Sequence, residues 1–294
     1  MREPSGRKSD LGRRGGPALL GRRHRTARRP AVDLAARPAL RKVDNWSLDR
    51  DVGALALRRG GGAVLALDDG FYFFRFRPRR ARADQKVDPD QPRTRLNDGK
   101  CDRRGRFFAG GMDDKEELTI CGLWRLDADL SVAQVDDGNH LLERPVLEPR
   151  RQDLLFRRYL PAGILGLRLR HRARTLSNKR VFATTKQDPG VADGSTVDAE
   201  GHMWNAQLIG GELVRYAPDG SVERRIGMPV RNITSVIFGG DRLDDIYVTS
   251  MARVKHPAVH DLFKPEVRPQ FGAGALYRIR GLGIRGLPEP RFAG

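Results

Sequence analysis

Short β-strands separated by Asp-Gly turns recur along most of this sequence, and they constrain the fold more than any other feature. An Asp68-Asp69-Gly70 turn and a Pro218-Asp219-Gly220 turn each stand between two apolar runs. An Asp-Gly pair in that position is a strong hairpin signal. The runs expected to form strands are residues 62–67, 71–74, 122–127, 130–135, 212–216, 222–226, 245–250 and 274–279.

One longer unit occurs twice. It reads Asp-x-x-Gly followed by an aromatic strand, from Asp102 to Phe108 and again from Asp198 to Trp204. Repeated short antiparallel strands of this kind predict the blades of a β-propeller. A sandwich fits less well because no Greek-key spacing recurs, and helical periodicity is scarce. We therefore predict an all-β propeller.

The positive charge of the chain is confined to three short segments. The formal net charge is +18, which invites a nucleic-acid interpretation. However, residues 1–42, 75–86 and 139–174 carry net charges of +10, +5 and +6. The remaining residues are therefore slightly negative, and nucleic-acid binding becomes a distant alternative.

Length and cysteine content place the chain in a broad class. Its 294 residues are enough for one large all-β domain. No apolar run is long enough to span a bilayer, so no membrane partner is expected. Cys101 and Cys121 are too few for a disulfide framework, which favours a reducing compartment, the cytoplasm. The oligomeric state is left open.

The side chains best suited to bind a ligand lie between Arg95 and Met112. Arg95, Asn97 and Asp98 are predicted to share a turn, which leads into a Gly-bounded aromatic strand. Such a turn offers a cation, an amide and a carboxylate to one polar ligand. The same Asn-Asp-Gly pattern is also ordinary turn chemistry, so a surface hairpin is the alternative.

These residues resemble the gluconolactonase/regucalcin (senescence marker protein, luciferin-regenerating-enzyme-like) family. The resemblance rests first on the stretch from Arg95 to Met112 and on residues 192–204, Ala-Asp-Gly-Ser-Thr-Val-Asp-Ala-Glu-Gly-His-Met-Trp. It continues through residues 239–249, 274–277 and 281–286 in the same order as in the family. It covers roughly residues 43–74, 87–138 and 175–294.

The resemblance implies a six-bladed β-propeller that hydrolyses sugar lactones at a divalent metal in its central channel. Calcium or zinc is expected, with magnesium or manganese as alternatives. Asp193 matches the family's metal ligand that also donates and accepts the proton. Arg95 and Asn97 match positions that contact the substrate. An acidic residue that the family has shortly after the Gly-x-Met falls here on Lys115.

The other two metal ligands of the family have no counterpart in the expected places. Residues 139–144 stand where a Ser-Asn-Gly turn belongs, and the N-terminal part offers no matching Glu. Reading the codons one nucleotide downstream permits the missing turn, and a similar shift permits a plausible hairpin over 75–86. We therefore hypothesise that the basic segments are frameshifted, which sequencing of the coding region would test.

These observations divide the chain into two parts. Residues 1–31 are expected to form an anomalous basic, disordered segment, and residues 32–294 a propeller domain in which 75–86 and 139–174 are anomalous, with 139–174 disrupted or disordered. We expect poor folding and impaired metal-dependent hydrolysis of sugar lactones. The alternative is a non-catalytic propeller that binds calcium or another ligand.

Overall fold

The computed structural model describes residues 44–77, 80–87, 93–115, 118, 120–139, 142–147, 153–158, 163–170, 175–185, 190–252 and 272–294. In this part of the chain every regular element is a β-strand, as predicted. Within the same residues, no helix is long and apolar enough to cross a membrane. The predicted disordered segment 1–31 lies outside the described residues.

The strands form five antiparallel sheets, each built from consecutive strands. The first three sheets comprise β1 (Val52–Leu57), β2 (Ala63–Leu67), β3 (Gly70–Arg75) and β4 (Arg80–Lys86); β5 (Thr94–Cys101), β6 (Phe107–Asp113), β7 (Cys121–Leu126) and β8 (Val132–Asn139); and β9 (Leu142–Leu147), β10 (Asp153–Arg158), β11 (Gly163–Arg170) and β12 (Thr175–Thr184). The last two comprise β13 (Val191–Val197), β14 (Met203–Leu208), β15 (Glu212–Tyr216) and β16 (Val222–Gly227); and β17 (Ile233–Gly239), β18 (Asp245–Ser250) and β19 (Leu276–Ile279).

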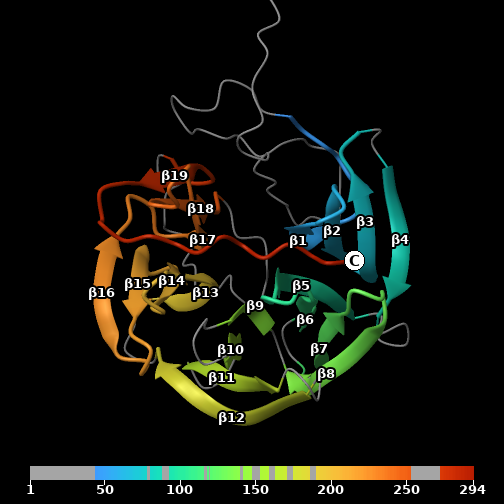
Figure 1. Ribbon diagram of the computed structural model, residues 1–294. Coiled ribbons are helices and arrows are strands. Elements are labelled where there is room, and N and C mark those ends of the chain that lie inside the picture. Colours follow the sequence, from blue (N-terminus) through green and yellow to red (C-terminus); the bar gives the residue numbers. More distant parts are fainter. Residues whose placement is uncertain are drawn as a thin grey trace, which may run out of the picture.

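The sheets are arranged around a common centre, as Figure 1 shows. The first strand of each sheet (β1, β5, β9, β13 and β17) lies innermost, and contacts join β1 to β5, β5 to β9, β9 to β13 and β13 to β17. This is the blade arrangement predicted from the sequence. A sixth blade would require residues outside the described ranges, so the blade count of six stays a prediction.

Two of the anomalous segments contain strands. The expectation of disorder over 139–174 is wrong for its described residues, because β9, β10 and β11 lie there and pair antiparallel. Segment 75–86 likewise supplies β4, which pairs with β3. The physical reason is visible at residues 167–170, where Leu alternates with Arg with the period of two that a strand requires.

The repeated Asp-x-x-Gly units form matching turns. In the turn between β5 and β6, Asp102 accepts hydrogen bonds from the backbone N–H groups of Arg104 and Arg106, at 2.9 and 2.8 Å. In the turn between β13 and β14, Asp198 does the same for the N–H groups two and four residues later, both at 3.0 Å. Both aspartates are fully buried. The repeat is therefore structural, since each carboxylate satisfies backbone donors that the turn leaves unpaired.

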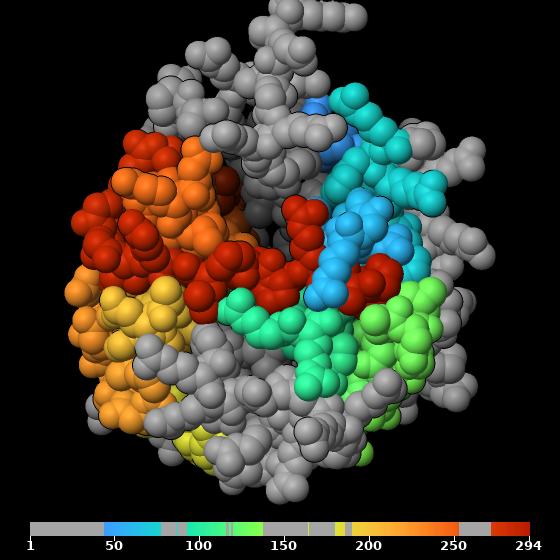
Figure 2. All heavy atoms as spheres, viewed as in Figure 1, coloured from blue at the N-terminus to red at the C-terminus, as the bar shows by residue number. Residues whose placement is uncertain are grey.

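A C-terminal segment, residues 284–294, links four of the sheets. The carbonyl of Arg285 accepts a hydrogen bond from the N–H of Ala199 at 2.8 Å, and the N–H of Gly286 donates to Leu243 at 2.7 Å. Further along, the N–H of Phe292 donates to Leu57, and the N–H of Ala293 donates to Gly105, both at 2.9 Å. Figure 2 shows these C-terminal residues crossing the middle of the visible face. The C-terminal segment thus bridges the turns where the inner strands end.

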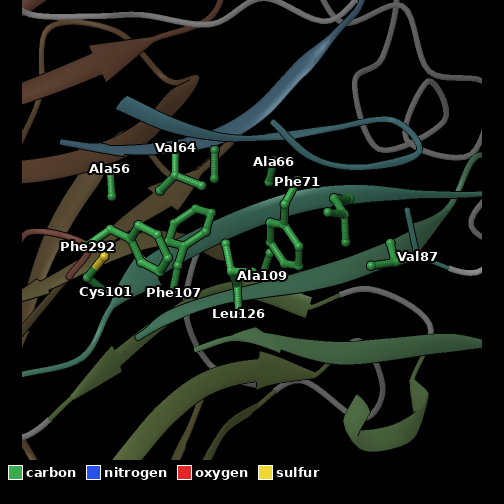
Figure 3. Packing of buried hydrophobic residues seen from close by; sticks show 12 residues of the cluster. Ala56, Val64, Ala66, Phe71, Val87, Cys101, Phe107, Ala109, Leu126 and Phe292 are labelled. Carbon is green, nitrogen blue, oxygen red and sulfur yellow. The ribbon is translucent and has the colours of Figure 1, made fainter. Parts of the chain in front are cut away.

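Phe292 also belongs to an apolar cluster that joins the first two sheets (Figure 3). Its ring stacks on Phe73 at a centroid distance of 6.0 Å, while Phe71 meets Phe107 edge to face at 5.8 Å. Phe71, Phe107 and Phe292 are fully buried. Burying such rings is a major source of stability, so the C-terminal segment is part of the core and not only a surface tie.

Candidate functional site

Each inner strand has an irregular register near its start. In β1 and β5 the irregularity leaves one extra residue, Gly53 and Asn97 respectively. In β13, Asp193 and Gly194 together stand opposite a single residue of β14. In β17 the extra residue is Thr234, and β9 is irregular opposite Phe156. A β-bulge changes the direction of the side chains at that point of the strand. We call these irregular positions near the starts of the inner strands the layer of bulges.

The prediction that Arg95, Asn97 and Asp98 lie on a turn is wrong, because all three lie in strand β5. The Asn-Asp-Gly pattern serves the bulge in place of a turn. The carboxylate of Asp98 accepts the N–H of the following Gly99 at 2.8 Å. A Cβ on Gly99 would lie 2.6 Å from the Phe108 carbonyl oxygen, so only glycine fits there. Bulges and turns favour the same small and polar residues, which is why the sequence did not separate them.

Neighbouring inner strands approach closely at this layer. A Cβ on Gly53 would lie 2.4 Å from the carbonyl oxygen of Asn97. A Cβ on Gly194 would lie 2.5 Å from the hydroxyl oxygen of Ser235. Both distances are far below ordinary contact, so glycine is required at each place. The bulges of β1 and β5, and those of β13 and β17, are therefore packed against one another.

Arg95 and Asn97, the two predicted substrate contacts, touch each other. Nη1 of Arg95 donates to Oδ1 of Asn97 at 3.3 Å, and Nε donates to Asp114 at 3.0 Å. Nη2 of Arg95 contacts the sulfur of Met112. The Arg95 side chain is 12% exposed, and Asn97 is fully buried. The guanidinium is thus held by several partners and still reaches solvent.

Asp193, the predicted proton carrier and metal ligand, lies in the bulge of β13 and is half-buried. Its main-chain carbonyl accepts a hydrogen bond from Nδ2 of Asn205 at 2.7 Å. Asn205 also donates to the hydroxyl of Ser195 at 2.8 Å and accepts from Gln207 at 2.7 Å. This buried chain of amides satisfies polar groups around the bulge and fixes the backbone from which the Asp193 carboxylate extends. Sequence reasoning did not identify Asn205.

The strands β5 and β13 face each other across the centre. Nζ of Lys100 lies 3.3 Å from the hydroxyl oxygen of Thr196, and both contact the same carboxylate oxygen of Glu289, at 2.8 and 3.1 Å. Lys100 follows Asn97 by three residues, and Thr196 follows Asp193 by three residues. This contact brings the inner strand that carries Asn97 close to the inner strand that carries Asp193.

The described residues supply only part of a metal site. They contain no group of three or more His, Cys, Asp or Glu side chains that could hold an ion. Asp193 offers one hard oxygen ligand of the kind that calcium prefers. The N-terminal residues and the side chains of 139–144, where the other family ligands would belong, lie outside the described residues. The donor set seen here is therefore too small to hold a cation by itself.

Comparison with known proteins adds an independent line of evidence. Residues 31–252 match the family model described as SMP-30/Gluconolactonase/LRE-like region. Regucalcin of Xenopus laevis is 30% identical over 263 residues, which cover 87% of this chain and 86% of that protein.

Two solved structures share the fold. A luciferin-regenerating enzyme superimposes with a TM-score of 0.76 at 22% identity, over 84% of this chain and 83% of that one. A calcium-binding protein, regucalcin from Agrobacterium tumefaciens, superimposes with a TM-score of 0.73 at 23% identity, over 84% and 81%. Together with the propeller-like arrangement of the sheets, the family match leads to one conclusion: the chain belongs to the SMP-30/gluconolactonase/LRE-like family.

Proposed function

We propose that this chain hydrolyses sugar lactones at the layer of bulges, with Asp193 as the catalytic residue and Arg95 and Asn97 as substrate contacts. The observation that supports the proposal most is the Lys100–Thr196 contact, because it joins the strand that carries Arg95 and Asn97 to the strand that carries Asp193. Arg95, Asn97 and Asp193 supply a cation, an amide and a carboxylate on these two strands, and family membership makes a lactone the ligand that we propose for them.

The reaction needs a proton to move twice. A water molecule attacks the lactone carbonyl carbon through its oxygen atom. At the same time, the Asp193 carboxylate accepts a proton from that water molecule. The carbonyl oxygen becomes negatively charged, and a guanidinium such as that of Arg95 stabilises such charge or holds sugar hydroxyls. The ring C–O bond then breaks, and Asp193 returns the proton to the leaving oxygen. The product is an open-chain hydroxy acid.

We also propose that activity depends on a divalent cation and is lower than in the relatives. Asp193 would be one ligand, and a bound cation supplies polarisation of the carbonyl. The low activity follows from the two family ligands that have no counterpart in the sequence. The described residues do not complete a cation site, and the two proton transfers belong to Asp193.

Hydrolysis of gluconolactone by the purified full chain tests the proposal. The protein is freed of metal, and the rate is followed in a pH-stat with calcium, zinc, magnesium or manganese added singly, after subtraction of spontaneous hydrolysis. Asp193→Asn is expected to lower kcat by about 100-fold or more, as loss of a general base does. Arg95→Met is expected to raise KM. Asp241→Asn, a change at an exposed residue, serves as the control.

Two results would count against a lactonase. Cation or lactone affinity without turnover would identify a binding propeller, the alternative function. Turnover unaffected by Asp193→Asn would show that hydrolysis occurs elsewhere on the protein.

A further inference from the structure

Two arginines near the start of β5 pair with two aspartates at the end of β6. Arg93 contacts the carboxylate of Asp113 through Nε and Nη2, at 2.8 and 2.7 Å. Arg95 contacts Asp114 through Nε at 3.0 Å. Asp113 is fully buried and also accepts the backbone N–H of Leu118 at 3.0 Å, so it anchors the following residues. The Asp114 side chain, by contrast, is 35% exposed and bonds Arg95 at the edge of the site.

The register of β5 and β6 explains this pairing. Arg95 stands opposite Met112, and the N–H of Asp114 donates to the carbonyl of Arg93 at 2.9 Å. Asp114 is therefore the diagonal neighbour of Arg95 on the same face of the sheet, a separation that long side chains bridge. The bulge at Asn97 comes two residues later and places the amide oxygen against the other side of the guanidinium.

The guanidinium of Arg95 has a different kind of contact at each of its nitrogens. Asp114 holds Nε, and Asn97 holds Nη1. The third nitrogen, Nη2, contacts the thioether of Met112, which is a weak hydrogen-bond acceptor. Asn97 and Met112 are neutral, whereas Asp114 is charged. Asp114 therefore gives Nε of Arg95 a charge-assisted hydrogen bond, which is stronger than a bond to either neutral group.

We propose that Asp114 is a positioning residue for substrate binding: it fixes Nε of Arg95 and so holds the guanidinium in the orientation that binds the substrate. This role rests on the proposed lactonase function. It is also distinct from the family's acidic residue at the position of Lys115, because Lys115 is exposed and the carboxylate on Arg95 comes one residue earlier. In this chain Asp114, which acts through Arg95, directly precedes Lys115, the position where the family has an acidic residue.

Kinetics of three variants test this role. Asp114→Asn is expected to raise KM for gluconolactone by about 5- to 10-fold, the scale of one charged hydrogen bond, with kcat changed by less than about twofold. Asp114→Glu keeps the carboxylate and is expected to restore most of the affinity. Asp68→Asn is the matched control, because Asp68 pairs with Arg50 at 3.2 Å and is 31% exposed.

A second measurement does not require turnover. Arg95 is modified with p-hydroxyphenylglyoxal, and the rate is read from its own peptide by mass spectrometry. Release of Nε is expected to make Arg95 react several times faster in Asp114→Asn than in the wild type, Asp114→Glu or Asp68→Asn. If the wild type shows no lactone hydrolysis, the proposed function fails, and the modification rate still decides whether Asp114 holds Arg95.

The proposal is overturned by an unchanged KM together with an unchanged modification rate in Asp114→Asn. It is equally overturned if kcat and thermal stability fall together and Asp114→Glu does not restore them, because that pattern belongs to a purely structural residue.

Discussion

Gly53 of β1 faces the main-chain carbonyl of Asn97 in β5 so closely that a Cβ there would lie 2.4 Å from the carbonyl oxygen. The neighbour is backbone, which cannot rotate away as a side chain would. The spacing of two inner strands, and with it the position of a proposed substrate contact, is therefore set by the absence of one methyl group.

Gly53→Ala is expected to destabilise the protein by about 1–3 kcal/mol, because the added methyl group forces β1 and β5 apart. Gly60→Ala is the matched control, since a Cβ at Gly60 meets nothing within 4 Å. Urea unfolding of both variants measures the difference. Equal stability of the two would show that the strands part without strain.

Asn205→Ala is expected to lower kcat and to destabilise the fold by about 1–3 kcal/mol. The amide of Asn205 bonds the carbonyl of Asp193 and the hydroxyl of Ser195, and all of these groups lose a buried partner together. Lactonase kinetics beside urea unfolding checks both effects. A destabilised variant that retains full kcat would contradict the view that Asn205 orients the bulge.

Phe292→Ala is expected to cost about 3–5 kcal/mol, the usual range for removing a buried aromatic ring. Phe292 is fully buried against Phe73 and belongs to the cluster that joins the first two sheets. Val222→Ala, at a residue that is 45% exposed, should change stability by less than about 0.5 kcal/mol. Thermal unfolding of both variants compares them, and similar melting temperatures would refute the structural role of the C-terminal segment.

Tyr72 makes stability depend on alkaline pH. Burial, aided by the hydrogen bond to Asp69, raises the pKa of Tyr72 to about 12, against roughly 10 in an unfolded chain. The folded state therefore binds the phenol proton more tightly. The stability that the protonated Tyr72 phenol gives to the folded state is fully present below about pH 10 and is lost as the pH rises toward 12.

Tyr72→Phe removes this titration. Urea unfolding measures the free energy of unfolding of the wild type and of Tyr72→Phe. The difference between the two is expected to become smaller from about pH 8 to pH 11. A difference that stays constant with pH would show that the phenol has the same pKa in both states.

Local patterns predicted most of the strands. The Asp68-Asp69-Gly70 turn connects β2 and β3 as expected, and strands occur at 212–216 and 245–250 with the predicted bounds. These hairpins depend on neighbouring residues and on a period of two, which a single sequence displays. The twin turns at Asp102 and Asp198 were visible for the same reason.

The site was less accessible to sequence reasoning. The resemblance selected Arg95, Asn97 and Asp193. Asn97 and Asp193 lie in the bulges of two inner strands, and Arg95 lies two residues before the bulge of β5. Asp114, in the turn after β6, and Asn205, in β14, are the partners that hold Arg95 and the backbone of Asp193. Their roles depend on register, and an Asn or Asp at such a position carries no local signal. The strands within 139–174 were missed because arginine content was weighed above the alternation of apolar residues.

The position of Phe292 has a consequence for synthesis in the cell. Its ring completes a core whose other members, including Val64 and Phe107, emerge from the ribosome much earlier. At roughly 5–20 residues per second, that core waits on the order of 10 to 40 seconds for its last aromatic side chain. The first two sheets are therefore translated long before they can close their core, and chaperones that shield apolar surface would act on this chain in that interval.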